Sequence, residues 1–477
     1  MRDEGMMRLR RGAQPLQRAK MRALFFLLLL FPGLALAQTG RFGSAGVPNI
    51  GPPEDALIPS LAAKQDRLEE QGWIVRGQAT FILQGNAGFR SPYRGAGSLT
   101  PAPQARNTLS TDLILGRRLW HGAEIIFNPS VTRGFGLSNS TGVAAFPNAE
   151  AFRLGSTDPT LSVPRIFFRQ TIGLSGDTVR SDNDPLRFTE ALPRERITFT
   201  LGKISVWDIF DDNRYAHDPR TQFMSWALVG AGGFDYAADA RGYTEGAALE
   251  WENGTWAVRG GAFRVARQVN GLFLDPSITR GFQLLASVER FWRIGEREGA
   301  LRAIYGYSRA RQSRWSELFQ NGFQTFDINP YGYRAKQNLA LSFDQQITQD
   351  FGIFARASWN DGRTQNWMFT EMDRALSFGG ALTGNRWGRP TDTLGLGTNI
   401  GWISGGRRRY LEAGGIGFIT GDGKLDYRPE WLTEAYYDAR VAPGVNMALG
   451  YSLIVNPAYN ADRGPVSIFS LRLRTAF

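Results

Sequence analysis

The sequence predicts an all-β fold, a transmembrane antiparallel β-barrel, and three observations lead to that prediction. Apolar and polar residues alternate with a period of two through most of the 477 residues, and turn residues separate the alternating segments. The chain begins with an export-type leader, and no later apolar run is long enough to cross a bilayer as a helix. Because every backbone amide in hydrocarbon needs a partner, strands in lipid must close into a barrel.

Residues 1–37 are predicted to be a secretory signal peptide. Basic residues precede an apolar run at 23–31, and the Ala-Leu-Ala at 35–37 supplies the small residues that a signal peptidase requires, so we expect cleavage before Gln38. Met21 is an alternative start. Removing 37 of the 477 residues leaves 440. The net charge then falls from +11 to about +6, because the leader holds seven basic and two acidic residues.

The composition of the remaining chain excludes several classes of function. A charge of this size does not imply nucleic acid as a partner. The chain has no cysteine, so neither disulfides nor thiolate metal sites stabilise it, and we expect no metal or other cofactor. Fifty of the 55 basic residues are arginine. A GC-rich genome alone would produce that bias, so it does not by itself identify a function.

Three regions are expected. The signal peptide (1–37) is followed by a periplasmic arm (38–72), whose first part is rich in Gly and Pro and lacks periodicity. A weak helical pattern from Ser60, a candidate cap, ends at Gly72 and predicts one short helix within this arm. The outer-membrane barrel is expected to occupy residues 73–477.

The alternation is clearest in the final segment. Odd positions from 469 to 475 carry Phe, Leu, Leu and Thr on one face, and Ser470, Arg472 and Arg474 lie on the other. One face therefore suits lipid and the other water. The same division recurs at 73–84 and in a predicted hairpin at 431–455.

Tight turns and chain length set the size of the barrel. Turns between strands are expected at 252–255, 295–299, 348–350 and 442–444. At roughly 25 residues for each strand with its connection, 440 residues make about 16 to 18 strands, and a barrel of that size keeps an aqueous channel. The aromatic residues expected at the membrane interfaces are Trp73, Trp120, Tyr305, Tyr307, Trp359, Trp402, Trp431 and Tyr451.

Several strings in the central region indicate a protein family more specifically than the composition does. The strings are GKISVWDIFDDNRYAHDPRTQF at 202–223, WAL at 226–228, FDYAADARGY at 234–243, FNP at 127–129, GFGL at 134–137 and RIFFRQTIG at 165–173. Together they resemble the carbohydrate-selective porins of the OprB type. The C-terminal half resembles that family mainly in its general pattern of alternating strands and in its terminal Phe477.

The resemblance implies a barrel of about sixteen strands in the bacterial outer membrane, with loops folded inward to narrow the channel. It also implies passive diffusion of mono- and oligosaccharides, and recognition of Phe477 by the outer-membrane assembly machinery. Outer-membrane lipid would surround the barrel, and a homotrimer remains an open alternative to a monomer. The chain lacks the long N-terminal coiled-coil region of some members, so an anchoring role is not expected.

A constriction that recognises sugars needs planar donors, carboxylate acceptors and an aromatic surface. The candidates for sugar contact are Lys203, Trp207, Asp208, Asp211, Asp212, Arg214, Arg220, Trp226, Asp235 and Arg241. A charge at the lipid midplane would cost about 2–4 kcal/mol, so charged strand residues are expected to face the lumen. The candidates for that wall are Arg76, Arg165, Arg169, Arg259, Arg302, Arg356 and Glu434. The alternative for the sugar-contact candidates is that their Asp and Arg residues pair with one another and hold a folded loop.

Three other functions are weighed against a sugar channel. Asp208 with Asp211 or Asp212 resembles the carboxylate pair of a glycoside hydrolase, but adjacent acidic residues beside Asn are usually turn formers. The two histidines, His121 and His217, are not spaced for a zinc site or a Ser-His pair. An arginine-rich lumen would also suit a general or anion-preferring porin, which is the main alternative. A purely structural barrel is the third.

Overall fold

The computed structural model describes residues 57–476 except 152–154, 182–183 and 321–331. The expected signal peptide, the start at Met21, most of the Gly- and Pro-rich arm and the terminal Phe477 lie outside the described residues. Among the helices in the described ranges, none has the length and apolar character needed to cross a membrane.

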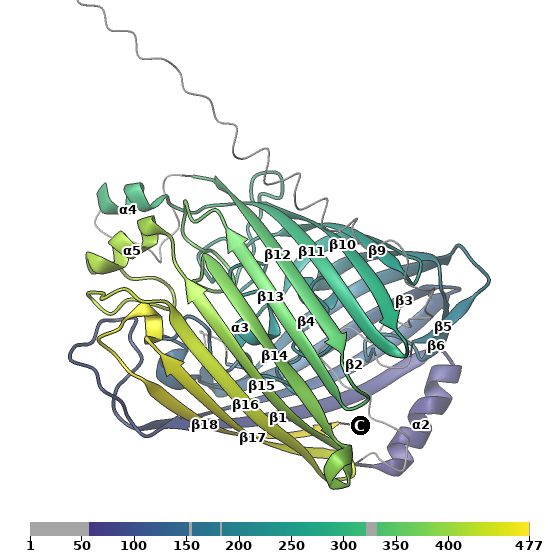
Figure 1. Ribbon diagram of the computed structural model, residues 1–477. Helices are drawn as coiled ribbons and strands as arrows, with labels where there is room; N and C mark the ends of the chain where they lie inside the picture. The colour runs from purple at the N-terminus through teal and green to yellow at the C-terminus, as the bar shows by residue number, and fades with distance from the viewer. Residues whose placement is uncertain (1–56, 152–154, 182–183, 321–331, 477) are drawn as a thin grey trace, which may run out of the picture.

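Sixteen antiparallel strands form one closed barrel, which confirms the predicted fold class (Figure 1). Each strand pairs with its neighbours along the chain, except that β4 pairs with β7, and β1 pairs with β18 to close the cylinder. The barrel strands are β1 (Trp73–Asn86), β2 (Gln104–Trp120), β3 (Ala123–Gly134), β4 (Ser156–Gly173), β7 (Arg196–Ile204), β8 (Thr244–Glu252), β9 (Trp256–Arg264), β10 (Phe282–Ile294), β11 (Arg297–Ala310), β12 (Arg334–Gln346), β13 (Phe351–Asn360), β14 (Arg374–Gly384), β15 (Arg389–Trp402), β16 (Glu430–Ala442), β17 (Val445–Val455) and β18 (Val466–Ala476).

The alternation of residues along the strands matches the two faces of the barrel wall. In β18, Phe469 is 59% exposed on the outer face, whereas Arg472 is 1% exposed on the inner face. β1 and β18 pair in the register Leu83 to Leu471, so outward residues of the first and last strands adjoin. The wall is therefore apolar outside and polar inside, as the sequence predicts.

The two ends of the barrel differ in the length of their connections. At the short-turn end, the predicted turns join β8 to β9, β10 to β11, β12 to β13 and β16 to β17. Gly254 and Gly295 have φ of 79° and 60°, a conformation that residues with a Cβ disfavour. At the long-loop end, the connections are 87–103, 135–155, 205–243, 265–281, 311–333, 361–373, 403–429 and 456–465.

A helix and a small hairpin lie together at the short-turn end, whereas α4 (Trp315–Gln320) and α5 (Gly405–Glu412) lie at the other end (Figure 1). The expected helix is α2 (Pro59–Glu70). Ile58 occupies its N-cap position and no side chain caps it, so the expectation that Ser60 caps this helix is wrong. Pro59 begins the helix because its fixed φ suits the first helical position.

The connection between β4 and β7 contains a hairpin that the sequence pattern did not predict. Its strands are β5 (Thr178–Ser181) and β6 (Glu190–Pro193). The described part of its tip, residues 184–188, is buried. The guanidinium of Arg76 donates to the backbone oxygens of Asp184 and Arg187 at 3.2 and 3.0 Å. This connection therefore folds against the inner wall instead of forming a simple turn.

Most of the predicted interfacial aromatics face outward. The exposed ones are Trp73, Trp120, Tyr305, Trp359, Trp431 and Tyr451, and Tyr307 and Trp402 are partly exposed. Trp73 begins β1 and Trp120 ends β2, so both mark the short-turn end. Tyr305 and Tyr451 lie nearer the middle of their strands than the sequence suggested.

Several long loops fold into the barrel and fill much of its interior. The longest, residues 205–243, is called the inward loop below and contains η3 (Val206–Asp208) and α3 (Trp226–Val229). Its apolar residues are buried against the wall and against the loops after β3, β9 and β13. The inward loop therefore occupies part of the barrel interior.

Candidate functional site

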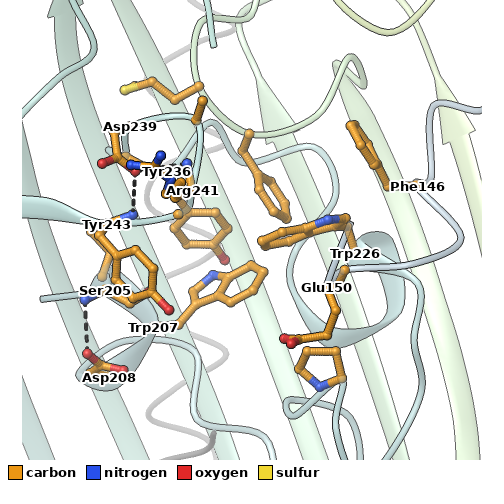
Figure 2. A pocket seen from close by; sticks show the side chains of 18 of the residues that line it. Phe146, Glu150, Ser205, Trp207, Asp208, Trp226, Tyr236, Asp239, Arg241 and Tyr243 are labelled. Carbon is orange, nitrogen blue, oxygen red and sulfur yellow. Dashed lines mark hydrogen bonds between the residues drawn. The ribbon is translucent and has the colours of Figure 1, made fainter. Parts of the chain in front are cut away.

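A cavity lies beside the inward loop, inside the barrel (Figure 2). The cavity has a volume of about 130 Å³ and opens to solvent on one side. Side chains from four loops and from β4 line it, so segments far apart in the sequence meet here.

An aromatic cluster forms one side of the cavity. The ring of Trp207 lies 5.0 Å from that of Trp226 and 5.1 Å from that of Phe369, and Tyr236 lies 5.6 Å from Trp207 (Figure 2). Both tryptophans are only partly buried. Their exposed faces suit the C–H face of a sugar ring.

The indole of Trp207 has an unused donor. Among the residues that the structure describes, Nε1 of Trp207 is buried and has no hydrogen-bond partner. A buried donor without a partner costs about 1–3 kcal/mol, so a hydroxyl group or a water molecule at this position would be stabilising.

Charged groups line the rest of the cavity in opposite pairs. Arg165 donates to both carboxylate oxygens of Asp208 at 2.7 Å, which is the two-point geometry that guanidinium favours. Arg220 lies 2.7 Å from Asp112 and 3.0 Å from Glu150. These pairs hold charge inside the lumen while leaving little net field.

Arg241 and Asp239 lie at another side of the cavity (Figure 2). Asp239 accepts from the backbone nitrogens of Arg241 and Tyr243 at 2.9 and 3.1 Å. The predicted residue Lys203 does not line the cavity, and its Nζ lies 3.9 Å from Asp239.

Two of the predicted acidic residues hold the inward loop in place. Asp211 is fully buried and accepts from Nε of Arg356 and from the hydroxyl of Tyr236, both at 2.8 Å. Asp235 accepts from the backbone nitrogens of residues 367–369, at distances of 2.7 to 3.0 Å. Neither carboxylate lines the cavity.

Asp212 and Arg214 also lie away from the cavity lining. Asp212 is half-buried. Arg214 pairs with Glu298 of β11 at 2.9 Å, which ties the inward loop to the wall. Five of the ten predicted contact residues therefore surround the cavity, namely Trp207, Asp208, Arg220, Trp226 and Arg241.

The predicted wall residues all face the interior. Each arginine has a carboxylate partner within 4.0 Å, and the pairs are Arg76–Glu69, Arg165–Asp208, Arg169–Glu124, Arg259–Glu250, Arg302–Asp344 and Arg356–Asp211. Glu434 is fully buried and accepts from the backbone nitrogens of Met224 and Ser225 at 2.6 and 3.0 Å. These two hydrogen bonds, called the Glu434 latch below, attach the inward loop to β16.

Sequence reasoning missed several cavity residues. Three of them, Tyr236, Asp239 and Tyr243, lie within the family-like string 234–243. The resemblance of that string to the family could have indicated them as candidates. Glu150 and Phe369 come from the loops after β3 and β13, and only the folded structure brings them to the cavity.

Burial shifts the pKa values of several titratable side chains of the inward loop, among them Tyr243 and His217. Burial raises the pKa of Tyr243 to about 12, so its hydroxyl stays protonated at neutral pH and can donate. Burial lowers the pKa of His217, which keeps its ring neutral. Nδ1 of His217 lies 2.9 Å from the backbone oxygen of Asp211, so Nδ1 carries the proton.

The hydrolase and metal-site alternatives find no support in the geometry. Asp208 and Asp211 are each held by an arginine, and neither pairs with the other. Within the described ranges, no group of three or more His, Cys, Asp or Glu side chains is arranged to hold a metal ion.

Comparisons with known proteins agree with this architecture. The family model for carbohydrate-selective porins of the OprB family matches residues 96–477. The high-pH structure of Pseudomonas putida OprB is similar with a TM-score of 0.67 at 16% identity, covering 89% of this chain and 99% of that one. The low-pH structure of that protein has a TM-score of 0.49 at 12% sequence identity, and the match covers 89% of this chain and 98% of that one. The structure of the outer membrane channel DcaP of Acinetobacter baumannii has a TM-score of 0.48 at 9% sequence identity, and the match covers 86% of this chain and 98% of that one. A comparison with curated protein sequences finds no match.

Proposed function

The chain belongs to the OprB family of carbohydrate-selective porins, and from this premise we propose that the cavity beside the inward loop is the constriction where passing sugars are recognised. A porin of this family is an outer-membrane channel and not an enzyme. The observation that carries the proposal is the partly exposed aromatic cluster of Trp207 and Trp226, set among paired charges.

The chemistry of the cavity suits a neutral, hydroxyl-rich solute. Trp207 and Trp226 offer ring faces, and Arg241 and Tyr243 offer polar groups. Binding must stay weak for transport, because a ligand held at about millimolar affinity gains only about 4 kcal/mol and leaves quickly.

The ion pairs of the wall favour sugar passage over anion passage. An anion-preferring pore needs unpaired positive charge along its lumen. Here the six wall arginines each have a carboxylate partner, so these six side chains add little net positive charge to the lumen. Of the ten predicted contact residues, we assign sugar contact to the five that line the cavity, and loop support to Asp211, Arg214 and Asp235. Asp212 receives neither role. Lys203 supports Asp239.

A first test replaces Trp207 with Ala and, separately, with Phe. In planar bilayers, we expect W207A to weaken the block of current by glucose and maltose about fivefold or more, since losing an aromatic contact costs about 1 kcal/mol. W207F keeps the ring, removes the donor and should weaken the block less. The matched control is W359F, whose side chain is 38% exposed on the outer face. Sugar block that is equal in all four proteins would show that the cluster only supports the fold.

The remaining expectations concern processing and partners. Residues 1–37 are proposed as a signal peptide and 38–72 as a periplasmic arm, so N-terminal sequencing of the exported protein should begin at Gln38. Outer-membrane lipid is the proposed surrounding of the barrel, and Phe477 is proposed as the mark for the assembly machinery. Deleting Phe477 should slow insertion without changing the conductance of inserted pores. Native mass measurement in detergent decides between one barrel and three.

A further inference from the structure

Three arginines surround one tyrosine at the long-loop end of β10, β11 and β12. The guanidinium carbons of Arg280, Arg311 and Arg309 lie 4.8, 5.2 and 5.7 Å from the ring centroid of Tyr333. This group is called the Tyr333 cluster below. Each stacking contributes only about 0.5–1 kcal/mol at an exposed site, and the like charges repel.

The register places this cluster on the outer surface of the barrel. Arg309 pairs with Phe282 across β10 and β11, and the Phe282 ring lies 6.2 Å from that of Tyr307. Tyr305, two residues further along β11, is 45% exposed on the outer face. Side chains two residues apart share a face. Arg309 and Tyr307 therefore face the same way as the lipid-facing Tyr305.

The positive charge of the cluster is only partly compensated. Asp275, which is fully buried, accepts from Nε of Arg311 at 3.3 Å and from the hydroxyl of Tyr333 at 2.8 Å. Within the part of the chain that the structure describes, neither Arg280 nor Arg309 has a carboxylate within 4.0 Å. Among the described residues, no carboxylate therefore neutralises these two guanidinium groups.

Exposed apolar side chains lie close to this charge. Phe273 and Ile278, in the same loop as Arg280, are 76% and 64% exposed. Below the cluster, the outer face of β10 and β11 continues with Leu284 and Tyr305, which are 48% and 45% exposed. A ligand that satisfies both surfaces is an amphiphile, with an anionic head and hydrocarbon chains.

We propose that the Tyr333 cluster binds the phosphate of a glycolipid in the outer leaflet. Long loops of such barrels face the cell exterior, and the leaflet there is built from a phosphorylated glycolipid. Guanidinium groups bind phosphate oxygens at two points, and basic clusters beside an apolar wall bind lipid headgroups. The acyl chains would then lie along β10 and β11.

The test measures binding of lipid A to the full-length exported protein in detergent by native mass spectrometry. Bisphosphorylated lipid A should bind the wild type, and its fully dephosphorylated form should bind at least about tenfold more weakly, because each lost charge-assisted hydrogen bond costs about 1.5–3 kcal/mol. The variant R280Q/R309Q should lose the same factor for bisphosphorylated lipid A. Equal affinity of the wild type and this variant for bisphosphorylated lipid A would overturn the proposal.

The control carries the same change at the opposite interface. Arg290 and Arg117 stack on Trp256 and Trp73 at 5.0 and 4.6 Å, near the short-turn end of the barrel. The variant R117Q/R290Q should bind lipid A as the wild type does, and an equal loss in this control would also overturn the proposal. Unchanged glucose-blocked conductance in R280Q/R309Q would show that its barrel is folded.

Discussion

At the scale of single residues, charges inside the lumen are arranged as pairs. Arg259 is the clearest case, because its buried side chain contacts Glu289 and lies 2.7 Å from Glu250. A buried ion pair adds little net stability over apolar residues, but removing one partner leaves an uncompensated charge. These side chains are therefore costly to change one at a time.

Replacing Arg259 with Met tests this arrangement. We expect the barrel to lose up to about 3–5 kcal/mol of stability, because buried Glu250 would lose this ion pair and buried Glu289 would keep only Arg302, at 3.5 Å. The loss is measured as a lower temperature for the shift in gel mobility on heating. The control is R408M, because the solvent-exposed ion pair of Arg408 with Glu412 should contribute little to stability. Equal transition temperatures for R259M and the wild type would contradict the account.

The candidate site was only partly predictable at this scale. Trp207, Asp208 and Arg220 were found because they lie in one continuous, family-like segment that folds as a unit. The sequence could not separate cavity residues from loop supports such as Asp211 and Asp235, since their roles depend on partners more than 100 positions away.

At the scale of elements, the inward loop is held by a hydrogen-bond acceptor and a donor on the wall. Glu434 of β16 receives two backbone N–H groups from residues 224 and 225, and Arg356 of β13 donates to the backbone oxygens of Ala216 and Leu228. The position of the loop therefore depends on strands that lie more than 100 residues later in the sequence. Its position determines the shape of the proposed constriction.

Exchange of Glu434 for Gln should loosen this loop. Glutamine keeps the size but offers one acceptor oxygen, so one buried N–H of the loop loses its partner at a cost of about 1–3 kcal/mol. Single-channel recordings should show larger current noise and weaker sugar block. T433V alters the opposite, outward face of the same strand and should record as the wild type. Matching noise in E434Q and the wild type would mean that the Glu434 latch is unimportant.

At the scale of the whole molecule, the barrel was predictable because alternation is a local property of each strand. The hairpin turns followed from Gly and Asn at the expected places, such as Asn253 and Gly254. The β5–β6 hairpin and the packing of loops inside the barrel were not predictable, because they depend on contacts between distant segments such as Arg76 with Asp184. Local patterns thus predict the wall, and long-range contacts determine the passage.

The measurement that tests the central claim most directly is solute uptake by liposomes that contain the purified wild-type protein. Swelling rates are compared for glucose and for gluconate, an anion of similar size. Because the lumen charges are paired and the constriction carries aromatic faces, we expect glucose to enter several times faster than gluconate. Entry of gluconate at the same or a higher rate would contradict the account and identify a general or anion-preferring pore.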